Sequence, residues 1–225
     1  LYHQKAAPEI SDYDYDQLKQ RLRALEAAFP ALAKETPAVA EVGDDRSGLF
    51  QTYRHRERMM SLDKTYDEAD LRAFHARLAK LLGRDDLAYV AEPKFDGFAV
   101  SATYEKGKLV RTVTRGNGIE GDDITANALM IRRLPRTLRS VAEDGTANVI
   151  PEVLEVRGEI YVSFADFERI NAEREAAGET TFANPRNLAT GTIRQLDAKE
   201  VERRGLEVVF YGVGACLPAG AQPAK

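Results

Sequence analysis

A predicted β-hairpin in the middle of the chain limits the possible folds more strongly than any other feature. Apolar side chains recur at every second position of FAVSATYE (98–105), and KLVRTVTR (108–115) is rich in β-branched residues, both typical of strands. Glu105, Lys106 and Gly107 supply turn residues between the two segments. Strands joined this directly are antiparallel, so the hairpin disfavours a doubly wound fold, in which a helix follows each strand.

The other predicted elements are helices inserted between successive strands, without strict alternation. Ser11 or Asp12 is the expected cap of the first helix, and Gly83 is expected to end the second. This order favours an α+β fold. The predicted helices cover residues 13–29, 67–82, 122–132 and 163–177, and the further strands cover 87–94, 153–162 and, as a buried strand, 205–215.

A polar, glycine-containing segment from Pro37 to Gly48 has the composition of a linker. We therefore expect a domain boundary near residue 49. It separates a small helical domain, residues 1–49, from a larger α+β domain, residues 50–225. No internal repeat is visible in the sequence.

The composition is that of a globular protein, with 44% hydrophobic and 30% charged residues in 225. No apolar run approaches the length of a membrane span, and the single cysteine excludes an internal disulfide and suits a reducing cytoplasm. The net charge is −4, yet residues 50–141 hold 17 basic and 13 acidic side chains. The densest basic cluster is Arg132, Arg133, Arg136 and Arg139. It permits a phosphate-bearing partner, although a solvated face has the same composition.

The segment AEPKFDG (91–97) places Lys94 and Asp96 at the junction of two predicted strands. Partial burial between apolar strands disfavours a charged ammonium, and a neighbouring cation such as Arg115 acts in the same direction. Only the uncharged amine carries the lone pair that a nucleophile needs. We therefore interpret Lys94 as a partly buried nucleophile, whereas an ordinary surface lysine beside a turn is the alternative.

The segment GNGIEG (116–121) matches the G-x-G-x-x-G pattern of dinucleotide-binding folds, and Glu143 falls at about the expected distance. Two observations argue against that reading. The helix expected after it begins with Asp122 and Asp123, which would repel a pyrophosphate. The preceding strand also belongs to a hairpin. We expect the glycines to shape a loop that presents Arg115.

Several further motifs accompany Lys94-Phe95-Asp96-Gly97 in a fixed order. They are TRGNGIEGDDIT (114–125), LEVRGEI (154–160), FANPRNLATGTIRQLD (182–197) and FYGVG (210–214), and the chain opens with LYH and APEISDYDYDQL. In order and spacing the chain resembles the bacterial NAD-dependent DNA ligases from end to end. The resemblance implies a nucleotidyltransferase domain, the ATP-grasp-like adenylation domain of ligases, built of antiparallel sheets with helices. A small helical domain, specific to the NAD-dependent branch, precedes it.

The resemblance assigns roles around an adenylate. Lys94 would form a lysine–AMP phosphoramidate, and Glu92 would accept from the adenine amino group. Asp96 and Glu159 would contact the ribose or help to hold Mg²⁺, and Arg115 would contact phosphate or ribose. Ser61 and Leu62 would line the nucleotide pocket and Tyr211 would stack on the adenine, although a tyrosine in an apolar strand is more often a core residue.

The resemblance also implies that the N-terminal residues bind the nicotinamide mononucleotide half of NAD. Tyr2 and His3 offer aromatic faces to the cationic nicotinamide ring. Asp12, Tyr15 and Asp16 would bind the same leaving group, although the aspartates also suit a helix start. Arg186 and Arg194 would face nucleotide or DNA phosphates, for which guanidinium groups are well suited.

Where the family often reads NAAAGSLRQLD, this chain has NLATGTIRQLD (187–197), with the bulkier Leu188 and Thr190. Both arginines are kept, so the departure concerns local packing. The sequence ends before two family motifs, Asp-Gly-Val-Val-Ile-Lys and Lys-Phe-Pro-Ala, whose lysines contact the α-phosphate. The first residue is Leu1, so we expect an N-terminally truncated small domain and a C-terminally incomplete adenylation domain. Zn²⁺ would be bound only by the absent part, and no metal ligand is firmly assigned here.

The resemblance predicts a cytoplasmic, nucleoid-associated bacterial enzyme of DNA replication and repair that acts on nicked double-stranded DNA with NAD and Mg²⁺. We expect a monomer without membrane contact. One alternative is an ATP-dependent nucleotidyltransferase, such as an RNA ligase or capping enzyme, which shares Lys-x-Asp-Gly but should lack the N-terminal motifs. The other is a non-catalytic nucleotide- or DNA-binding remnant.

Overall fold

The computed structural model describes residues 12–33, 46, 48–62, 64–141, 144–195 and 197–218. The chain divides into two compact units, Met60–Phe95 and Leu1–Met59 with Asp96–Lys225. Among the described helices, none is long and apolar enough to cross a membrane.

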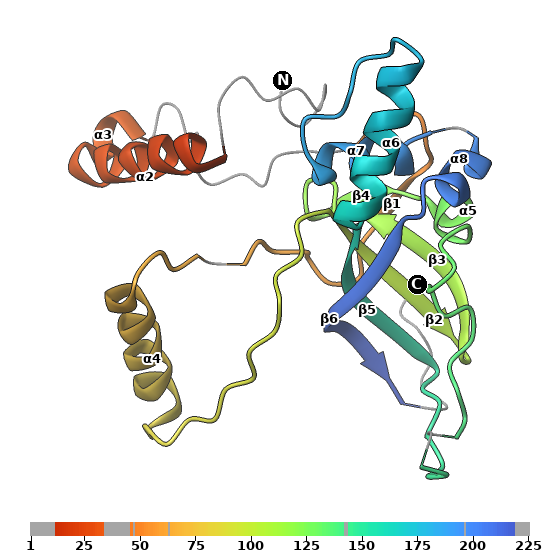
Figure 1. Ribbon diagram of the computed structural model, residues 1–225. Helices are drawn as coiled ribbons and strands as arrows, with labels where there is room; N and C mark the ends of the chain where they lie inside the picture. Colours follow the sequence, from red (N-terminus) through yellow and green to blue (C-terminus); the bar gives the residue numbers. More distant parts are fainter. Residues whose placement is uncertain are drawn as a thin grey trace. The chain divides into compact units, whose positions relative to one another are not determined.

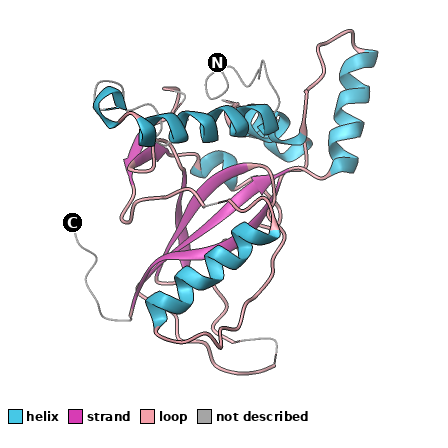
Figure 2. Ribbon diagram, turned by 90° about the vertical axis from the view of Figure 1, so that its left-hand side faces the viewer, coloured by secondary structure: helices cyan, strands magenta, loops and turns pink. Residues whose placement is uncertain are grey.

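A four-stranded antiparallel sheet forms the centre of the larger unit (Figure 1). Its strands are β2 (Phe98–Glu105), β3 (Lys108–Thr114), β5 (Val153–Tyr161) and β6 (Glu207–Leu217), in the order β3-β2-β5-β6. Figure 2 shows the long strands in magenta, running side by side. The α+β prediction with antiparallel strands is confirmed.

The predicted hairpin forms as β2 and β3, and its turn explains the choice of residues. Lys106 and Gly107 both have positive φ, 49° and 78°. Two consecutive residues with positive φ make the turn whose twist suits an antiparallel pair, and glycine takes up that conformation without a steric penalty.

Helices cover one face of the sheet and complete the hydrophobic core. They are α5 (Thr125–Ala128), α6 (Phe164–Ala176), α7 (Pro185–Ile193) and α8 (Ala198–Arg203). Phe98, Val100 and Ile160 from the sheet belong to the same buried cluster as Ile170 of α6 and Leu188 of α7. Leu188 is fully buried, so the bulkier residue of this chain is accommodated as a core residue. Burial of one such side chain stabilises the fold by about 1.5–3 kcal/mol.

A second, two-stranded sheet pairs β1 (Thr52–Arg54) with β4 (Glu120–Asp122). Strand β4 follows the loop Arg115–Ile119, in which Gly116 and Gly118 have positive φ. A Cβ at Gly116 would lie 1.8 Å from the Glu120 carbonyl oxygen, so only glycine fits there. The last two residues of GNGIEG thus belong to the short strand β4 and not to a phosphate-binding helix, in agreement with the rejection of the dinucleotide-binding pattern.

Two further helices, α2 (Asp12–Ala28) and α3 (Pro30–Ala33), precede β1 in the sequence. α2 confirms the predicted first helix. The large apolar residues Tyr15, Leu18, Leu22 and Leu25 of α2 are exposed, and so is Phe29 directly after it.

The unit Met60–Phe95 contains the helix α4 (Glu68–Leu82). The Asp67 carboxylate accepts a hydrogen bond from the Asp70 amide at the N-terminus, and Gly83 takes the left-handed conformation that ends the helix. The predicted helix 67–82 is confirmed.

Three predicted elements differ from the structure. Residues 87–94 form no strand, because they make no ladder of hydrogen bonds with a partner strand among the described residues. The helix predicted over 122–132 is limited to α5, since the chain continues in three-residue turns that still bury Ile131 and Leu134. The strand predicted over 205–215 forms as β6, Glu207–Leu217, and lies at the edge of the sheet, so Tyr211 and Val213 are exposed and not buried.

Candidate functional site

The junction Asp96-Gly97-Phe98, directly after Lys94 and Phe95, is joined to two distant segments. The Asp96 carboxylate accepts a hydrogen bond from the guanidinium of Arg186, with 3.0 Å between Nη1 and Oδ1. The Gly97 amide donates to the Glu159 carboxylate at 3.2 Å. A Cβ at Gly97 would lie 2.1 Å from the Ile160 carbonyl oxygen, so β5 can approach only a glycine. The motif Lys-x-Asp-Gly thus needs its glycine for packing.

Arg115 and Glu159 flank Ala99 on the sheet face opposite the helices. The Arg115 amide donates to the Ala99 carbonyl at 3.0 Å, and Glu159 is the register partner of Ala99 on β5. Phe98 and Val100 point into the helical core, so the side chain of Ala99 and its lateral neighbours lie on the other face. The structure therefore brings these two predicted residues to one place.

Tyr211 joins this face through a β-bulge. Gly158 pairs with Phe210 and Arg157 with Gly212, which leaves Tyr211 as the extra residue. Burial raises the pKa of Tyr211, the Glu159 carboxylate raises it further, and Arg115 and Arg157 act in the opposite direction. Tyr211 is 44% exposed, so it is not the core residue that its apolar strand would suggest.

The face is rich in guanidinium groups with unused donors. Arg56, Arg115 and Arg157 each have an Nε that is buried and makes no hydrogen bond within the described part of the chain. Burial raises the pKa of the nearby Glu155 carboxyl, an effect that Arg157 and Arg56 oppose and Glu57 increases. A cluster of three guanidinium groups suits the binding of an anion.

His55 holds the backbone of Arg115. Its Nε2 lies 3.1 Å from the Arg115 carbonyl oxygen, and because a carbonyl only accepts, Nε2 carries the proton. Nδ1 lies 3.5 Å from the Ser101 hydroxyl. The backbone amide of His55 donates to the Ile119 carbonyl at 2.9 Å. His55 thus connects β1 to the loop that presents Arg115.

Acidification is expected to destabilise the fold through His55. Burial lowers the pKa of His55 from 6.5, and Arg157 lowers it further, whereas hydrogen bonds to the Arg115 and Thr114 backbone oppose the shift. The unfolded chain therefore binds the proton first, and stability present above pH 6.5 is lost as the pH falls. The slope is at most about 1.4 kcal/mol per pH unit.

This expectation is checked by measuring unfolding free energies from pH 8 down to pH 5 for the wild type and His55→Gln. The difference between the two should be constant above pH 7 and should shrink or reverse below pH 6.5. A difference that stays constant over the whole range would contradict a buried, neutral His55.

Helix α7 presents the two other predicted arginines. Asn184 caps its N-terminus by accepting from the Asn187 amide at 2.8 Å, and Pro185 occupies the first turn. Arg186 pairs with Asp96, as described above. At the other end the Arg194 guanidinium lies over the Phe98 ring, with 5.2 Å between Cζ and the ring centroid. One helix therefore brings both arginines to the start of β2.

Four predicted residues belong to the unit Met60–Phe95, and all are exposed: Ser61, Leu62, Glu92 and Lys94. The expectation that Lys94 is partly buried is therefore wrong in this structure. Its segment is not a strand, so no flanking strands cover the side chain. Among the N-terminal residues, Tyr15 is an exposed residue of α2, and Asp12 and Asp16 belong to the same helix. Tyr2 and His3 lie outside the described residues.

The sequence reasoning did not single out His55 or Asn127, both buried polar residues. Asn127 donates from Nδ2 to the carbonyl oxygens of Ile193 and Gln195, at 2.7 Å each. The backbone carbonyls that these two side chains contact are 60 or more residues away in the chain. Only the polarity of Asn127 within an apolar segment signals such a role, because His55 stands among charged residues.

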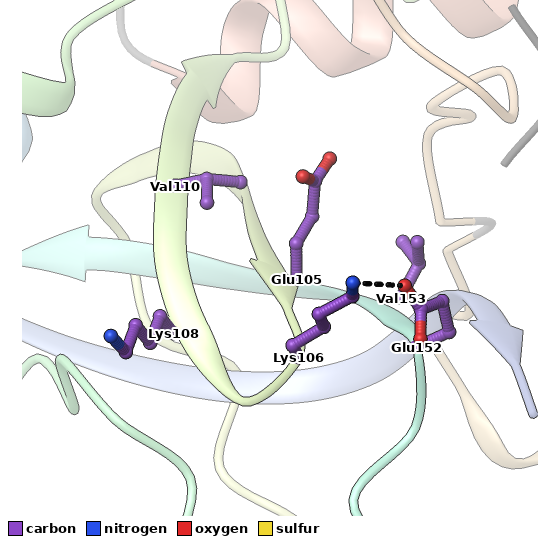
Figure 3. Close-up of a pocket in the computed structure, with 6 residues that line it drawn as sticks. All are labelled: Glu105, Lys106, Lys108, Val110, Glu152 and Val153. Atoms are coloured by element: carbon purple, nitrogen blue, oxygen red, sulfur yellow. Dashed lines mark ion pairs between the residues drawn. The ribbon is translucent and has the colours of Figure 1, made fainter. Parts of the chain in front are cut away.

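A surface hollow of about 380 Å³ lies at the opposite end of β2 from Asp96. Figure 3 shows the Lys106 ammonium directed at the Glu152 carboxylate, an ion pair of 3.5 Å. None of the predicted site residues lines it. The lining residues are Glu105, Lys106, Lys108, Val110, Glu152 and Val153.

Two family profiles match the chain. The profile described as NAD-dependent DNA ligase adenylation domain covers residues 47–223. The profile described as DNA ligase-like, N-terminal NAD+-binding domain covers residues 1–40. Both profiles describe DNA ligase domains that use NAD, so they do not favour an ATP-dependent nucleotidyltransferase.

Curated relatives agree with the profiles. The chain is 59% identical over 223 residues to DNA ligase 1 of Opitutus terrae, which covers 99% of this chain and 32% of the relative. It is 52% identical to DNA ligase 2 of the same organism and 44% identical to the DNA ligase of Agrobacterium fabrum, each over 100% of this chain and 31% and 30% of the relative. The chain thus spans about a third of the length of these relatives. With one profile covering most of its length, the chain belongs to the NAD-dependent DNA ligase adenylation domain family.

Proposed function

We propose that the protein carrying this chain adenylates itself with NAD and then seals nicks in double-stranded DNA. The observation that carries the proposal is the convergence at the start of β2. Asp96 pairs with Arg186, Gly97 donates to Glu159, and Arg115 flanks the same strand, directly after the lysine of Lys-x-Asp-Gly. A lysine that precedes such a set of carboxylates and guanidinium donors in the sequence suits nucleotidyl transfer better than simple binding.

In the first step Lys94 Nζ attacks the phosphorus of the adenylate half of NAD. A P–N bond forms, the P–O bond to nicotinamide mononucleotide breaks, and the amine loses a proton to the surroundings. The AMP then passes from Lys94 to the 5′-phosphate of a nick. Attack of the 3′-hydroxyl on that phosphate forms the phosphodiester and releases AMP.

The roles proposed for the adenylate site follow the chemistry of each side chain. Glu92 accepts from the adenine amino group, and Tyr211 stacks on the base from its exposed bulge. Arg115 contacts phosphate or ribose through its guanidinium group. Arg186 and Arg194 contact nucleotide or DNA phosphates, and Ser61 and Leu62 line the nucleotide pocket.

Asp96 and Glu159 are proposed to contact the ribose or to help hold Mg²⁺. No group of three or more possible metal ligands occurs in the part of the chain that the structure describes. Two carboxylate side chains nevertheless fit Mg²⁺, which binds oxygen ligands and usually combines one or two carboxylates with substrate phosphates. When bound, Mg²⁺ would neutralise charge that develops on the phosphoryl group.

We further propose that residues 1–49 form a small domain that binds the nicotinamide mononucleotide half through Tyr2, His3, Asp12, Tyr15 and Asp16. Residues 50–225 then form the nucleotidyltransferase domain. Nicked duplex DNA is the proposed partner, and a monomer in the bacterial cytoplasm, associated with the nucleoid and acting in replication and repair, is the proposed setting. The basic residues among 50–141 are compatible with a polyanionic partner.

The test is the choice of donor by the full-length protein. In the presence of Mg²⁺, labelled AMP should be transferred to the protein from NAD and not from ATP, and the adenylated protein should seal a nicked duplex. Equal labelling from ATP would favour the ATP-dependent alternative. Absence of labelling from either donor would favour a non-catalytic remnant.

A further inference from the structure

Asn127 is a buried side chain whose two hydrogen bonds both go to the residues that flank a proposed phosphate-contacting arginine. It is 2% exposed and lies in α5. Its Nδ2 donates to the carbonyl oxygens of Ile193 and Gln195, 2.7 Å each, and these residues stand on either side of Arg194. An asparagine amide nitrogen has two hydrogens, and both are used here.

These two hydrogen bonds, called the Asn127 clamp below, occupy the carbonyl of the last residue of α7 and a carbonyl directly beyond the helix. α7 ends at Ile193, and the last carbonyls of a helix have no partner within it. Arg194 is the capping residue at this end. Because Asn127 binds the carbonyl before and the carbonyl after Arg194, it fixes the direction in which that side chain leaves the backbone.

Asn127 is itself held in place by the sheet. The neighbouring Thr125 accepts a hydrogen bond from the Thr112 amide of β3 at 2.9 Å and also bonds to Asp123. Asp123 pairs with Arg111 of β3 at 3.2 Å. Hydrogen bonds through Asn127 therefore connect the C-terminal end of α7 to the α5 segment, which is bound to β3. The ion pair between Arg186 and Asp96 connects the N-terminal end of α7 to the start of β2.

By holding the backbone on either side of Arg194, the Asn127 clamp controls the position of the Arg194 guanidinium. It lies 5.2 Å over the ring of Phe98, which follows Asp96-Gly97. We propose that Asn127 is a positioning residue, which aims Arg194 at the phosphate that Arg194 contacts. This inference rests on the proposed function of Arg194. Misplacement of a contacting group by about 1 Å is enough to reduce a rate by about 10²-fold.

The test compares variants of the full-length protein in two separate steps: self-adenylation with NAD, and nick sealing by the pre-adenylated protein. Arg194→Ala should slow at least one step, and Asn127→Ala should slow the same step or steps by about 10- to 100-fold. In the Arg194→Ala background, Asn127→Ala should have a further effect of less than about threefold, because the group that it positions is already gone.

Asn171→Ala is the matched control. Asn171 also makes two hydrogen bonds to backbone, to the amide and carbonyl of Phe182 at 2.8 and 2.9 Å, but none to the residues around Arg194. Its loss should lower the melting temperature by a similar amount, and its effect on rate should multiply with that of Arg194→Ala. Asn127→Ser keeps one donor and serves if the alanine variant does not fold, with an expected rate between those of wild type and Arg194→Ala.

Three results would overturn the inference. The effects of Asn127 and Arg194 substitutions could multiply, as for Asn171, which would make Asn127 a structural residue only. Asn127→Ala could slow a step that Arg194→Ala spares. Arg194→Ala could slow neither step, which would also remove the proposed role of Arg194. A wild-type protein that is not labelled by NAD would instead refute the proposed function, and this is seen without any variant.

Discussion

Self-adenylation of the full-length protein is expected to disappear when Lys94 is replaced by alanine. Among the proposed site residues at the start of β2, Lys94 alone can form the P–N bond, because the carboxylates of Asp96 and Glu159 contain no nitrogen and a guanidinium group is a poor nucleophile. Removal of a covalent nucleophile typically lowers a rate by about 10⁴-fold or more. Lys94→Arg should be equally inactive, since it keeps the positive charge but not the nucleophilic amine.

The measurement is the intact mass of the protein after incubation with NAD and Mg²⁺, followed by peptide mapping. Lys80→Ala is the matched control, since Lys80 is an exposed lysine of α4 in the same unit as Lys94. It should gain one AMP at the wild-type rate. AMP on any residue other than Lys94, or adenylation of the Lys94→Ala protein, would show that the nucleophile is misassigned.

Deletion of residues 1–49 is expected to abolish reaction with NAD and to spare nick sealing on DNA that already carries AMP at its 5′-phosphate. The first sixteen residues hold the aromatic and acidic groups proposed to bind the nicotinamide mononucleotide half. Binding energy from that non-transferred half is what aligns the reacting phosphorus with Lys94, so its loss affects the rate of the chemical step as well as affinity. The final sealing step involves no nicotinamide and should not need these residues.

Sealing of pre-adenylated DNA is therefore the internal control for folding of the shortened protein. The point variants Tyr2→Ala and Asp16→Ala should reproduce the defect without any deletion. If the shortened protein reacts with NAD as fast as the intact one, NAD recognition must be located elsewhere, and the domain assignment of residues 1–49 fails. If both reactions are lost together, the proposed separation of the two domains fails.

Local sequence patterns were sufficient to predict those elements whose turns and caps are formed by residues close together in the sequence. The hairpin of β2 and β3 follows from alternation and from a turn in which Gly107 has φ 78°. The ends of α4 follow from the Asp67 cap and Gly83, since both contacts lie within a few residues. Short sequence separation is the reason that these predictions hold.

Equally clear patterns gave wrong predictions of strands and of burial where the outcome depends on a partner strand or on a neighbouring layer of the fold. Residues 87–94 alternate like a strand but make no sheet among the described residues, and Lys94 is consequently exposed. β6 is as apolar as a central strand, yet it lies at the edge, and a bulge turns Tyr211 outward. Burial depends on which surface is opposite, and the local pattern does not contain that information.

The sequence by itself determined which chemical groups this protein has and their order: a lysine in Lys-x-Asp-Gly, the arginines, and the carboxylates that accompany them. Only the tertiary structure decided that Asp96 meets Arg186, that Gly97 meets Glu159, and that His55 and Asn127 hold the arginines in place. The members of each of these pairs are separated by about 60 to 90 residues. The physical reason is that hydrogen bonds and ion pairs act over a few ångströms, and only sheet register and helix packing bring such distant groups that close.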